Sequence, residues 1–291
     1  MVTPAEKPKA VGLLVEEGLS QRIGCELLGV CRSKLFYRQR KNPEKEALVA
    51  AIRKLAFKHP RYGYRRVHEM LRRQGIIVEI NQVHRLWKKE RLAVKPVKKK
   101  RKRNRGPWLS TPPRAKYPNH VWTYDFMQDQ LANGKKLKIL NIVDEFTRKC
   151  LRIEVKRSMG GKDVLECLRK TMAVYGIPAF IRSDNGSEFI EKGLREWLAQ
   201  QGTQTVYVRP GSPWENGKCE SFNGKFRDEF LNREIFYTLL QAQIQMEWWR
   251  THYNTERPHS ALGYQTPQEF YEAWQDRQPQ PKPLRAANNG E

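Results

Sequence analysis

The order of strand-like and helix-like segments after residue 120 constrains the fold of this chain more than any other feature. Three segments have the alternating pattern of strands and are joined by short polar connections that suit hairpins. These segments are residues 121–127, 138–144 and 150–155. Helices and strands then alternate, with a helix over 162–175, a strand over 179–184, a helix over 193–201 and a strand over 205–208. This order predicts an α/β domain with a mixed sheet and helices on its faces.

Three carboxylates occupy unusual positions in this pattern. Asp125 lies inside the first strand, where aspartate is disfavoured, and it alternates with the large residues Tyr124 and Phe126. Asp184 ends the fourth strand, and Glu220 lies near the start of a helix that we expect to run to about residue 236. A carboxylate inside a strand favours a bound cation, so these acids are the first candidates for a catalytic site.

The front of the chain has the pattern of short helices. Ser20 is the expected N-cap of a helix over 21–28, Gly29 closes it, and another helix follows over 32–40. Together they resemble a helix-turn-helix, in which Arg32, Ser33 and Phe36 would face DNA. A plain helical hairpin is the alternative.

A second helical module is expected after the break at Asn42-Pro43. Its helices are predicted over 44–58, 64–74 and 81–91, the last with Asn81 as N-cap. A cluster of basic and aromatic residues between the first two helices suits phosphate contact with stacking, although single basic residues here could be solvated instead. The candidate DNA-binding residues of this cluster are Arg61, Tyr64, Arg65 and Arg66.

Positive charge is concentrated in the front of the chain. The 291 residues carry a net charge of +24, and residues 1–120 hold 31 Lys and Arg against 9 Asp and Glu. Eight of the eleven residues from Lys95 to Arg105 are basic, and four prolines follow by residue 118, which predicts an extended linker. Lys98, Lys99, Lys100 and Arg101 are its candidate DNA contacts. Such a distribution indicates a polyanionic partner, and nucleic acid is the first candidate.

The five cysteines are odd in number and form no Cys-x-x-Cys pair, so we expect reduced thiols and neither a disulfide framework nor an ordinary zinc ribbon. No apolar run is long enough to span a membrane, and the first residues lack the apolar core of a signal peptide. We therefore expect no membrane partner and a cytoplasmic, nucleoid-associated prokaryotic protein.

The acids and their flanking motifs resemble those of a known family. The motifs are Trp122-Thr-Tyr-Asp, Ser183-Asp-Asn-Gly-Ser-Glu-Phe, Asn216-Gly before Glu220, and Tyr253-Asn-Thr-Glu-Arg-Pro-His-Ser-Ala-Leu followed by Thr266-Pro267. They are similar to the motifs of second-reading-frame (OrfB) transposases of the insertion-sequence-three family, in the DDE transposase and retroviral integrase superfamily. The likeness extends over nearly the whole chain.

This resemblance implies a ribonuclease-H-like catalytic core preceded by all-α modules. It also implies that Asp125, Asp184 and Glu220 are the DDE triad, each both catalytic and metal-binding. Two divalent ions about 3.5 to 4 Å apart can stabilise the attacking and leaving oxygens of phosphodiester transfer. Mg²⁺ suits such carboxylate ligands, and Mn²⁺ is a substitute. The expected reaction is cleavage of the DNA ends of an insertion element, followed by strand transfer.

Further residues are expected to position DNA around the triad. Asn223 and Arg227 follow Glu220 at i+3 and i+7 and therefore share its helix face. The remaining candidate DNA contacts are Asn185, Asn216, Lys218 and Lys225. A later cluster of Tyr253, Asn254, Arg257 and His259 has two alternative roles, docking against the sheet or DNA contact.

The expected organisation has five parts. They are a helix-turn-helix-like segment at 1–42, a second helical DNA-binding module at 43–94, a basic linker at 95–118, the catalytic core with C-terminal helices at 119–275 and a tail at 276–291. The partners implied are element and target DNA, further copies of the chain on paired ends, and a first-reading-frame (OrfA) protein. A ribonuclease-H-type nuclease without strand transfer and a catalytically inactive DNA-binding regulator are the alternative functions.

Overall fold

The computed structural model describes residues 3, 6–36, 42–94, 114–183, 192–207 and 217–278. They belong to two compact units, residues 1–51 and 52–291. No helix among the described residues has the length and apolar character needed to cross a membrane. The fold class expected from the sequence, a mixed α/β core preceded by helices, is confirmed.

The first unit contains three short helices. They are α1 (Lys7–Glu16), α2 (Gln21–Leu27) and α3 (Arg32–Phe36). Ser20 caps α2 as expected, since its hydroxyl accepts a hydrogen bond from the backbone N–H of Ile23 at 3.4 Å. Val11 of α1 and Cys25 of α2 are buried, and Gly24 lets the two helices approach closely.

The second helical module consists of α4 (Pro43–Lys58), α5 (Tyr64–Arg73) and α6 (Ile80–Lys89). Within the second unit its core contains Ile52, Val67, Leu71, Val83 and Trp87. The prediction that Asn81 caps α6 is wrong. The helix begins one residue earlier, and the extended residue before it is Glu79, so Asn81 lies inside the first turn.

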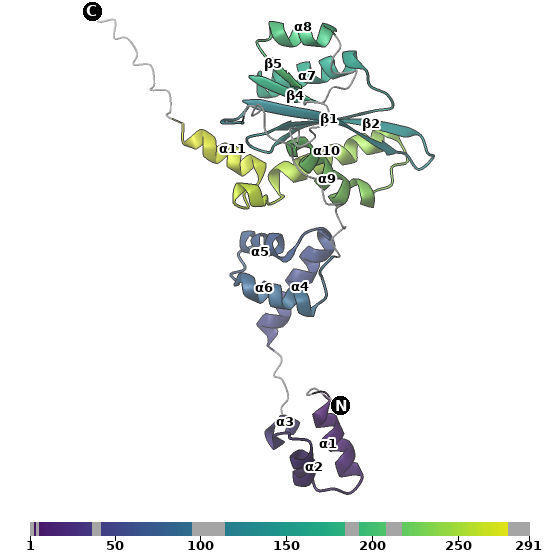
Figure 1. Ribbon diagram of the computed structural model, residues 1–291, viewed down its shortest axis with the longest axis vertical. Coiled ribbons are helices and arrows are strands. Elements are labelled where there is room, and N and C mark those ends of the chain that lie inside the picture. The colour runs from purple at the N-terminus through teal and green to yellow at the C-terminus, as the bar shows by residue number, and fades with distance from the viewer. Residues whose placement is uncertain are drawn as a thin grey trace, which may run out of the picture. The chain divides into compact units, whose positions relative to one another are not determined.

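The α/β domain is built on a five-stranded sheet with the order β3-β2-β1-β4-β5 (Figure 1). The strands are β1 (Val121–Gln130), β2 (Lys136–Asp144), β3 (Cys150–Lys156), β4 (Phe180–Ser183) and β5 (Gln204–Tyr207). The first three strands pair antiparallel, whereas β4 pairs parallel with β1 and β5 parallel with β4. The sequence predicted this mixed arrangement.

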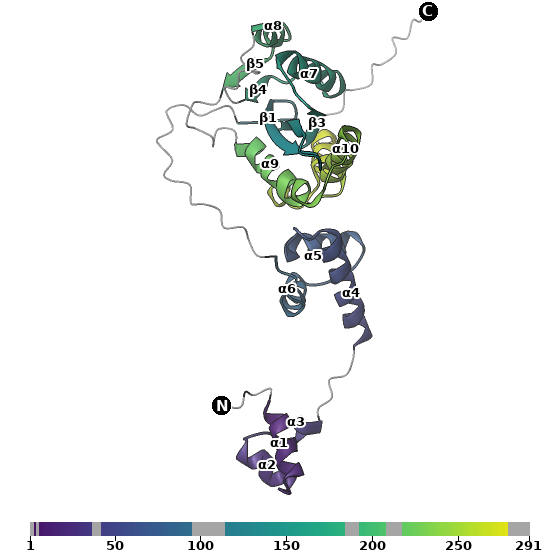
Figure 2. The same ribbon diagram turned by 90° about the vertical axis from the view of Figure 1, so that its right-hand side faces the viewer.

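Helices cover both faces of the sheet, as Figures 1 and 2 show. On one face lie α7 (Gly161–Tyr175) and α8 (Lys192–Gln200), and on the other lie α9 (Gly217–Glu229) and α10 (Leu239–Thr255). The last helix is α11 (Pro267–Asp276), which begins with a capping box between Thr266 and Glu269. Each face therefore has its own apolar core.

The alternation along β1 assigns each side chain to one of these cores. Trp122 and Tyr124 pack in the core below α7 and α8, with Phe126 against it, whereas Met127 packs in the core with α9 and α10. Because side chains of a strand alternate between faces, Asp125 points to the face that α9 and α10 cover.

The helix that carries Glu220 is shorter than the sequence predicted. It ends at Glu229, where the prediction extended it to about residue 236. Phe230 leaves helical geometry, a single 3-10 turn follows over Leu231–Arg233, and Phe236 pairs with Leu131 at the β1–β2 hairpin. The chain leaves the helix because Phe230, Leu231 and Phe236 are all buried against that hairpin.

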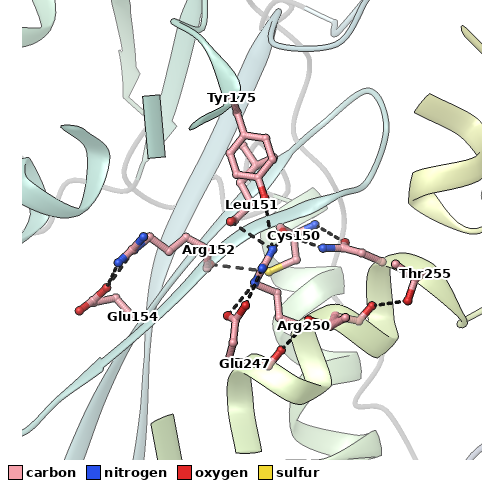
Figure 3. Close-up of polar contacts among 10 residues, drawn as sticks. Cys150, Leu151, Arg152, Glu154, Tyr175, Glu247, Arg250 and Thr255 are labelled. Carbon is pink, nitrogen blue, oxygen red and sulfur yellow. Dashed lines mark hydrogen bonds and ion pairs between the residues drawn. The ribbon is translucent and has the colours of Figure 1, made fainter. Parts of the chain in front are cut away.

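Side chains of α10 cover the start of the edge strand β3, and Figure 3 shows Arg250 beside Cys150 and Leu151. Asn254 accepts a hydrogen bond from the Cys150 N–H at 2.9 Å and donates one to its carbonyl at 2.8 Å, as a neighbouring strand would. Arg250 donates to the carbonyls of Cys150 and Leu151 and pairs with Glu247 at 2.6 Å. These contacts satisfy backbone groups that an edge strand would otherwise leave open.

Candidate active site and nucleic-acid interface

The site is centred where β1 lies against α9. Asp125 lies in the middle of β1 and is paired with Asn141 in the register of β2. Glu220 lies in the first turn of α9, and both acids are partly exposed. Helix α9 packs directly on β1 and β2, so the helix and the strand bring Glu220 and Asp125 to the same side of the sheet.

Two buried amides connect these elements. Asn223 lies one turn after Glu220 and donates a hydrogen bond to Asp125 Oδ2 at 2.9 Å. Asn141 donates in turn to Asn223 Oδ1 at 2.8 Å. Both amides are buried, and a buried hydrogen bond is costly to lose because its partner is left unsatisfied. The three side chains therefore fix the orientation of the Asp125 carboxylate relative to α9.

The end of β4 reaches the same region. Its parallel pairing places Arg182 beside Thr123 of β1, and Ser183 is the last described residue before the gap in the description. Arg182 and Glu145 form a buried ion pair at 2.5 Å, with 5% and 4% of their side chains exposed. Burial raises the pKa of Glu145, and the guanidinium of Arg182 opposes that rise. The pair joins the end of β4 to the segment after β2.

Seven expected site residues fall outside the described residues. Three of them are Asp184, Asn185 and Asn216, and the other four are Lys98, Lys99, Lys100 and Arg101 of the linker. Among the described residues there is no group of three His, Cys, Asp or Glu side chains that could hold a metal ion. The structure thus brings together two of the three expected acids in adjacent elements and does not describe the third.

The apolar environment beneath the acids keeps Cys219 neutral. This thiol is fully buried in α9, and burial followed by the nearby Asp125 carboxylate raises its pKa well above the ordinary value. A thiol with so high a pKa is a poor nucleophile at neutral pH. Cys219 is therefore a packing residue next to the site.

The other residues of α9 expected to bind DNA differ in their surroundings. Arg227 donates a hydrogen bond to the carbonyl of Gln128 at 2.8 Å, so it ties α9 to β1. Lys218 is exposed, whereas Lys225 is half-buried. Burial, and then the neighbouring cations Arg257, Arg66 and Arg148, lower the pKa of Lys225 to about 8.

The expected DNA contacts in the helical modules also separate into two groups. Arg61 pairs with Asp228 at 2.5 Å and Arg66 with Glu229 at 3.3 Å, both carboxylates at the end of α9. Arg65 is exposed and lies over the half-buried ring of Tyr64. In the first unit Arg32, Ser33 and Phe36 are exposed on α3, and Phe36 is 67% exposed.

The late cluster docks against the domain. Asn254 caps β3, Tyr253 is buried under α9, and Arg257 forms an ion pair with Glu229 at 2.5 Å. His259 is buried, and desolvation with the nearby Arg257 lowers its pKa to about 2. Of the two alternatives left open by the sequence, these contacts favour docking for Asn254 and Tyr253.

Sequence reasoning missed Asn141, Glu145 and Arg182. Asn141 gave a signal that could have been used, since it interrupts the apolar run Ile139-Leu-Asn-Ile-Val143 just as Asp125 interrupts β1. The Arg182–Glu145 pair gave none, because its members are 37 residues apart and in different elements.

Comparisons with known proteins agree with this architecture. Models of the integrase core domain match residues 115–213 and 201–267, and a model of an HTH-like domain matches residues 43–101. The HTH-like match covers α4, α5 and α6, and not the helix pair of the first unit that the sequence pattern indicated as a helix-turn-helix.

Insertion-element proteins are similar over most of their length. The 31.7 kDa protein of insertion element IS407 from Burkholderia multivorans is 37% identical over 254 residues, which cover 87% of this chain and 90% of that protein. The 39.2 kDa protein of IS476 from Xanthomonas euvesicatoria is 36% identical over 272 residues, 92% of this chain and 78% of that protein. Among solved structures, the catalytic core domain of HTLV-2 integrase in complex with magnesium aligns with 54% of this chain and 99% of its own, at 18% identity and a TM-score of 0.42.

Proposed function

Because the chain belongs to the insertion-sequence-three family, within the DDE transposase and retroviral integrase superfamily, we propose that it cleaves the DNA ends of a mobile element and joins them to target DNA. The observation that carries this proposal is the hydrogen bond from Asn223 to Asp125. It holds α9, and with it Glu220, against the strand of the first acid. Asp184 follows directly after β4, the strand that pairs with β1.

Asp125, Asp184 and Glu220 are the residues that would hold divalent metal ions. Their oxygen donors suit Mg²⁺, and Mn²⁺ is the expected substitute. The fit is consistent with Asn223, which donates an N–H to Asp125 Oδ2 and so orients that carboxylate as an outer-shell group does. When bound, two such ions stabilise the attacking and leaving oxygens of an in-line phosphodiester displacement.

The remaining chemistry belongs to the chain's own residues and the DNA. Water attacks the phosphodiester at the element end and frees a 3′-OH, and that hydroxyl then attacks a phosphodiester of the target, whose own 3′ oxygen leaves. Arg227 and the amide chain from Asn141 hold α9 on the sheet during both steps. No covalent protein intermediate is required, which agrees with the neutral, buried thiol of Cys219.

DNA recognition is assigned to the front of the chain. The exposed residues of α3 and the exposed Arg65 supply contacts, and the basic linker at Lys98, Lys99, Lys100 and Arg101 supplies phosphate affinity without sequence preference. We expect the protein to act on the nucleoid as a homo-oligomer that holds paired ends, and a first-reading-frame protein to add end recognition.

The test is incubation of the purified chain with Mg²⁺ and labelled DNA that carries the end of its element. We expect cleaved and strand-joined products from the wild type and neither from Asp125→Asn or Glu220→Gln. The matched control is Glu166→Gln on α7, which covers the other face of the sheet and should keep full activity. Cleavage without joining would favour a nuclease. Binding without metal-dependent chemistry would favour a DNA-binding regulator.

A further inference from the structure

A basic pocket lies beside α9, separate from the carboxylates of the site. Its volume is about 200 Å³. Residues from α5, the β2–β3 loop, α9 and the segment after α10 line it, and none of its described lining residues is an Asp or a Glu. The cationic lining residues are Arg66, Arg148, Lys218, Lys225 and Arg257.

The pocket and the acids use different flanks of the same helix. At about 100° per residue, Lys218, Ser221 and Lys225 share one flank of α9. Glu220, Asn223 and Arg227 share another, roughly 160° away. The buried face between these flanks carries Cys219, Phe222 and Phe226, which fix the helix on the sheet. A group bound in the pocket therefore does not also contact the carboxylates. The pocket and the carboxylates lie on different flanks of α9.

The positive charge in this pocket is only partly balanced. Arg257 and Arg66 share the carboxylate of Glu229. Among the described residues, no carboxylate lies at ion-pair distance from Arg148, Lys218 or Lys225. The acid that acts most on Arg148 and Lys218 is the buried Glu145, which is already paired with Arg182. The pKa of Lys225 is depressed by burial and by the three arginines around it, so its own neighbours disfavour its charged form. Like charges gathered at low exposure cost free energy, and a bound anion would offset that cost.

Arg148 supplies an independent observation. Its backbone has φ +64°, a left-handed conformation that favours glycine or asparagine, yet the residue at this turn is arginine. The Arg148 side chain lines the pocket and is half-buried there. Residues in sparsely populated backbone regions cluster at ligand-binding sites, so this conformation is consistent with a role of the Arg148 side chain in the pocket.

We propose that this pocket binds one backbone phosphodiester of the DNA, so that α9 holds the nucleic acid on one flank while the reaction takes place on the other. The inference rests on the proposed function, since that function supplies the DNA. Guanidinium groups donate in a planar fork that matches phosphate oxygens, and ammonium groups add charge. Ser221 and Ser260, which also line the pocket, add neutral donors.

The test measures DNA affinity of the full chain in EDTA, where no chemistry occurs, as a function of KCl concentration. Lys225→Gln should weaken binding several-fold and lower the slope of log K against log salt by about 0.9, the loss expected for one phosphate contact. The loss should be equal on element-end DNA and on an unrelated duplex, because a phosphate contact reads no sequence. The matched control is Lys170→Gln, an exposed residue of α7 with the same change of charge.

Thermal unfolding without DNA separates binding from a structural role. Lys225→Gln and Arg148→Gly should unfold at or above the wild-type Tm, since the first relieves like-charge repulsion and the second relieves the left-handed backbone. Arg148→Gly should nevertheless weaken DNA binding as Lys225→Gln does.

Wild-type affinity and slope in both pocket variants would overturn the proposal. So would a lower Tm without any loss of DNA affinity, which would assign these residues to stability. A loss restricted to element-end DNA would also overturn it, because it would indicate base reading. If the wild type binds DNA through the pocket but forms no joined product in Mg²⁺, the proposed function is wrong and phosphate binding in the pocket is still supported.

Discussion

At the scale of single residues, orientation of Asp125 depends on a relay of two amides across three elements. Asn141 of β2 donates to Asn223 of α9, and Asn223 donates to Asp125 of β1. A carboxylate that must hold metal ions needs its rotamer fixed, and outer partners of this kind commonly change metal affinity or activity by 10- to 100-fold. We therefore propose Asn223 as a positioning residue of the candidate site.

We expect Asn223→Ala to lower strand-transfer activity by at least about 10-fold and to raise the Mg²⁺ concentration needed for half-maximal rate. The matched control is Asn254→Ala, which also removes a buried amide with two hydrogen bonds, in this case to the Cys150 backbone. Both variants should lose about 1 to 3 kcal/mol of stability. An unchanged Mg²⁺ requirement in Asn223→Ala would contradict the positioning role.

The candidate site could be predicted from the sequence only in part. Asp125 and Glu220 were found because an acid inside a strand and a motif before a helix are visible in the sequence itself. Asn141 was missed because its role depends on a helix 82 residues later in the chain. The sequence alone could not distinguish the roles of the arginines in the front half. In the structure Arg61 and Arg66 bind carboxylates more than 160 residues away, whereas Arg65 is exposed.

At the scale of elements, the end of α9 is joined to both α5 and the segment after α10. Glu229 accepts hydrogen bonds from Arg257 at 2.5 and 2.6 Å and pairs with Arg66. The Arg257 side chain is 1% exposed. Its desolvation lowers the pKa of the guanidinium, whereas the hydrogen bonds and charge of Glu229 raise that pKa and keep the group charged. Removing one member of a buried ion pair leaves the other charge uncompensated.

Arg257→Met should therefore lower the free energy of unfolding by about 3 kcal/mol or more, measured by urea denaturation. Arg53→Met is the matched control. Its guanidinium pairs with Glu90 but is 56% exposed, and such pairs contribute about 0 to 1 kcal/mol. Equal losses in the two variants would show that burial does not determine the strength of this contact.

A stack of aromatic rings joins the helical module to α10. His59 stacks on Tyr62 at 4.6 Å and on His252 at 5.2 Å between ring centroids. Burial, followed by His252 and Lys58, lowers the pKa of His59 to about 4. The unfolded chain takes up this proton near pH 6.5, so the stabilisation is present above pH 6.5 and is lost as the pH falls towards 4.

We expect this histidine to account for up to about 3 kcal/mol of stability lost between pH 6.5 and 4. His59→Phe keeps an aromatic ring in the stack and cannot be protonated, so its urea midpoint should depend less on pH in that interval. The same pH dependence in wild type and variant would contradict the assignment.

Element types were more predictable than element ends. All five strands and the two helices α7 and α8 follow from periodicity, because each buries one face or one stripe against the sheet. The end of α9 did not follow, since the burial of Phe230 and Phe236 against the β1–β2 hairpin is a tertiary effect. The start of α6 also differed, because an N-cap residue must itself be non-helical and the extended residue before this helix is Glu79.

At the scale of the whole molecule, the chain is divided by charge as well as by fold. The first 120 residues carry almost all of the excess positive charge, and the sheet domain is close to neutral. Affinity for DNA should therefore come mainly from the front of the chain and should fall steeply with salt.

Replacing Lys98, Lys99, Lys100 and Arg101 together with glutamine should reduce the slope of log K against log salt by up to about 3 to 4, since each lost phosphate contact is worth about 0.9. Because the composition of this segment predicts an extended linker without a core, we expect the Tm of the protein not to change. Fluorescence anisotropy with labelled duplex measures the slope. An unchanged slope would show that the linker does not contact DNA.

The most direct test of a shared metal site concerns Asp184. Thiolates prefer softer metals than Mg²⁺, so Asp184→Cys should be inactive in strand transfer with Mg²⁺ and should regain activity with Mn²⁺, whereas Asp184→Ala should be inactive with both ions. That pattern would establish Asp184 as a metal ligand, as the proposed triad requires. Wild-type activity of Asp184→Cys or Asp184→Ala with Mg²⁺ would contradict the assignment of this triad.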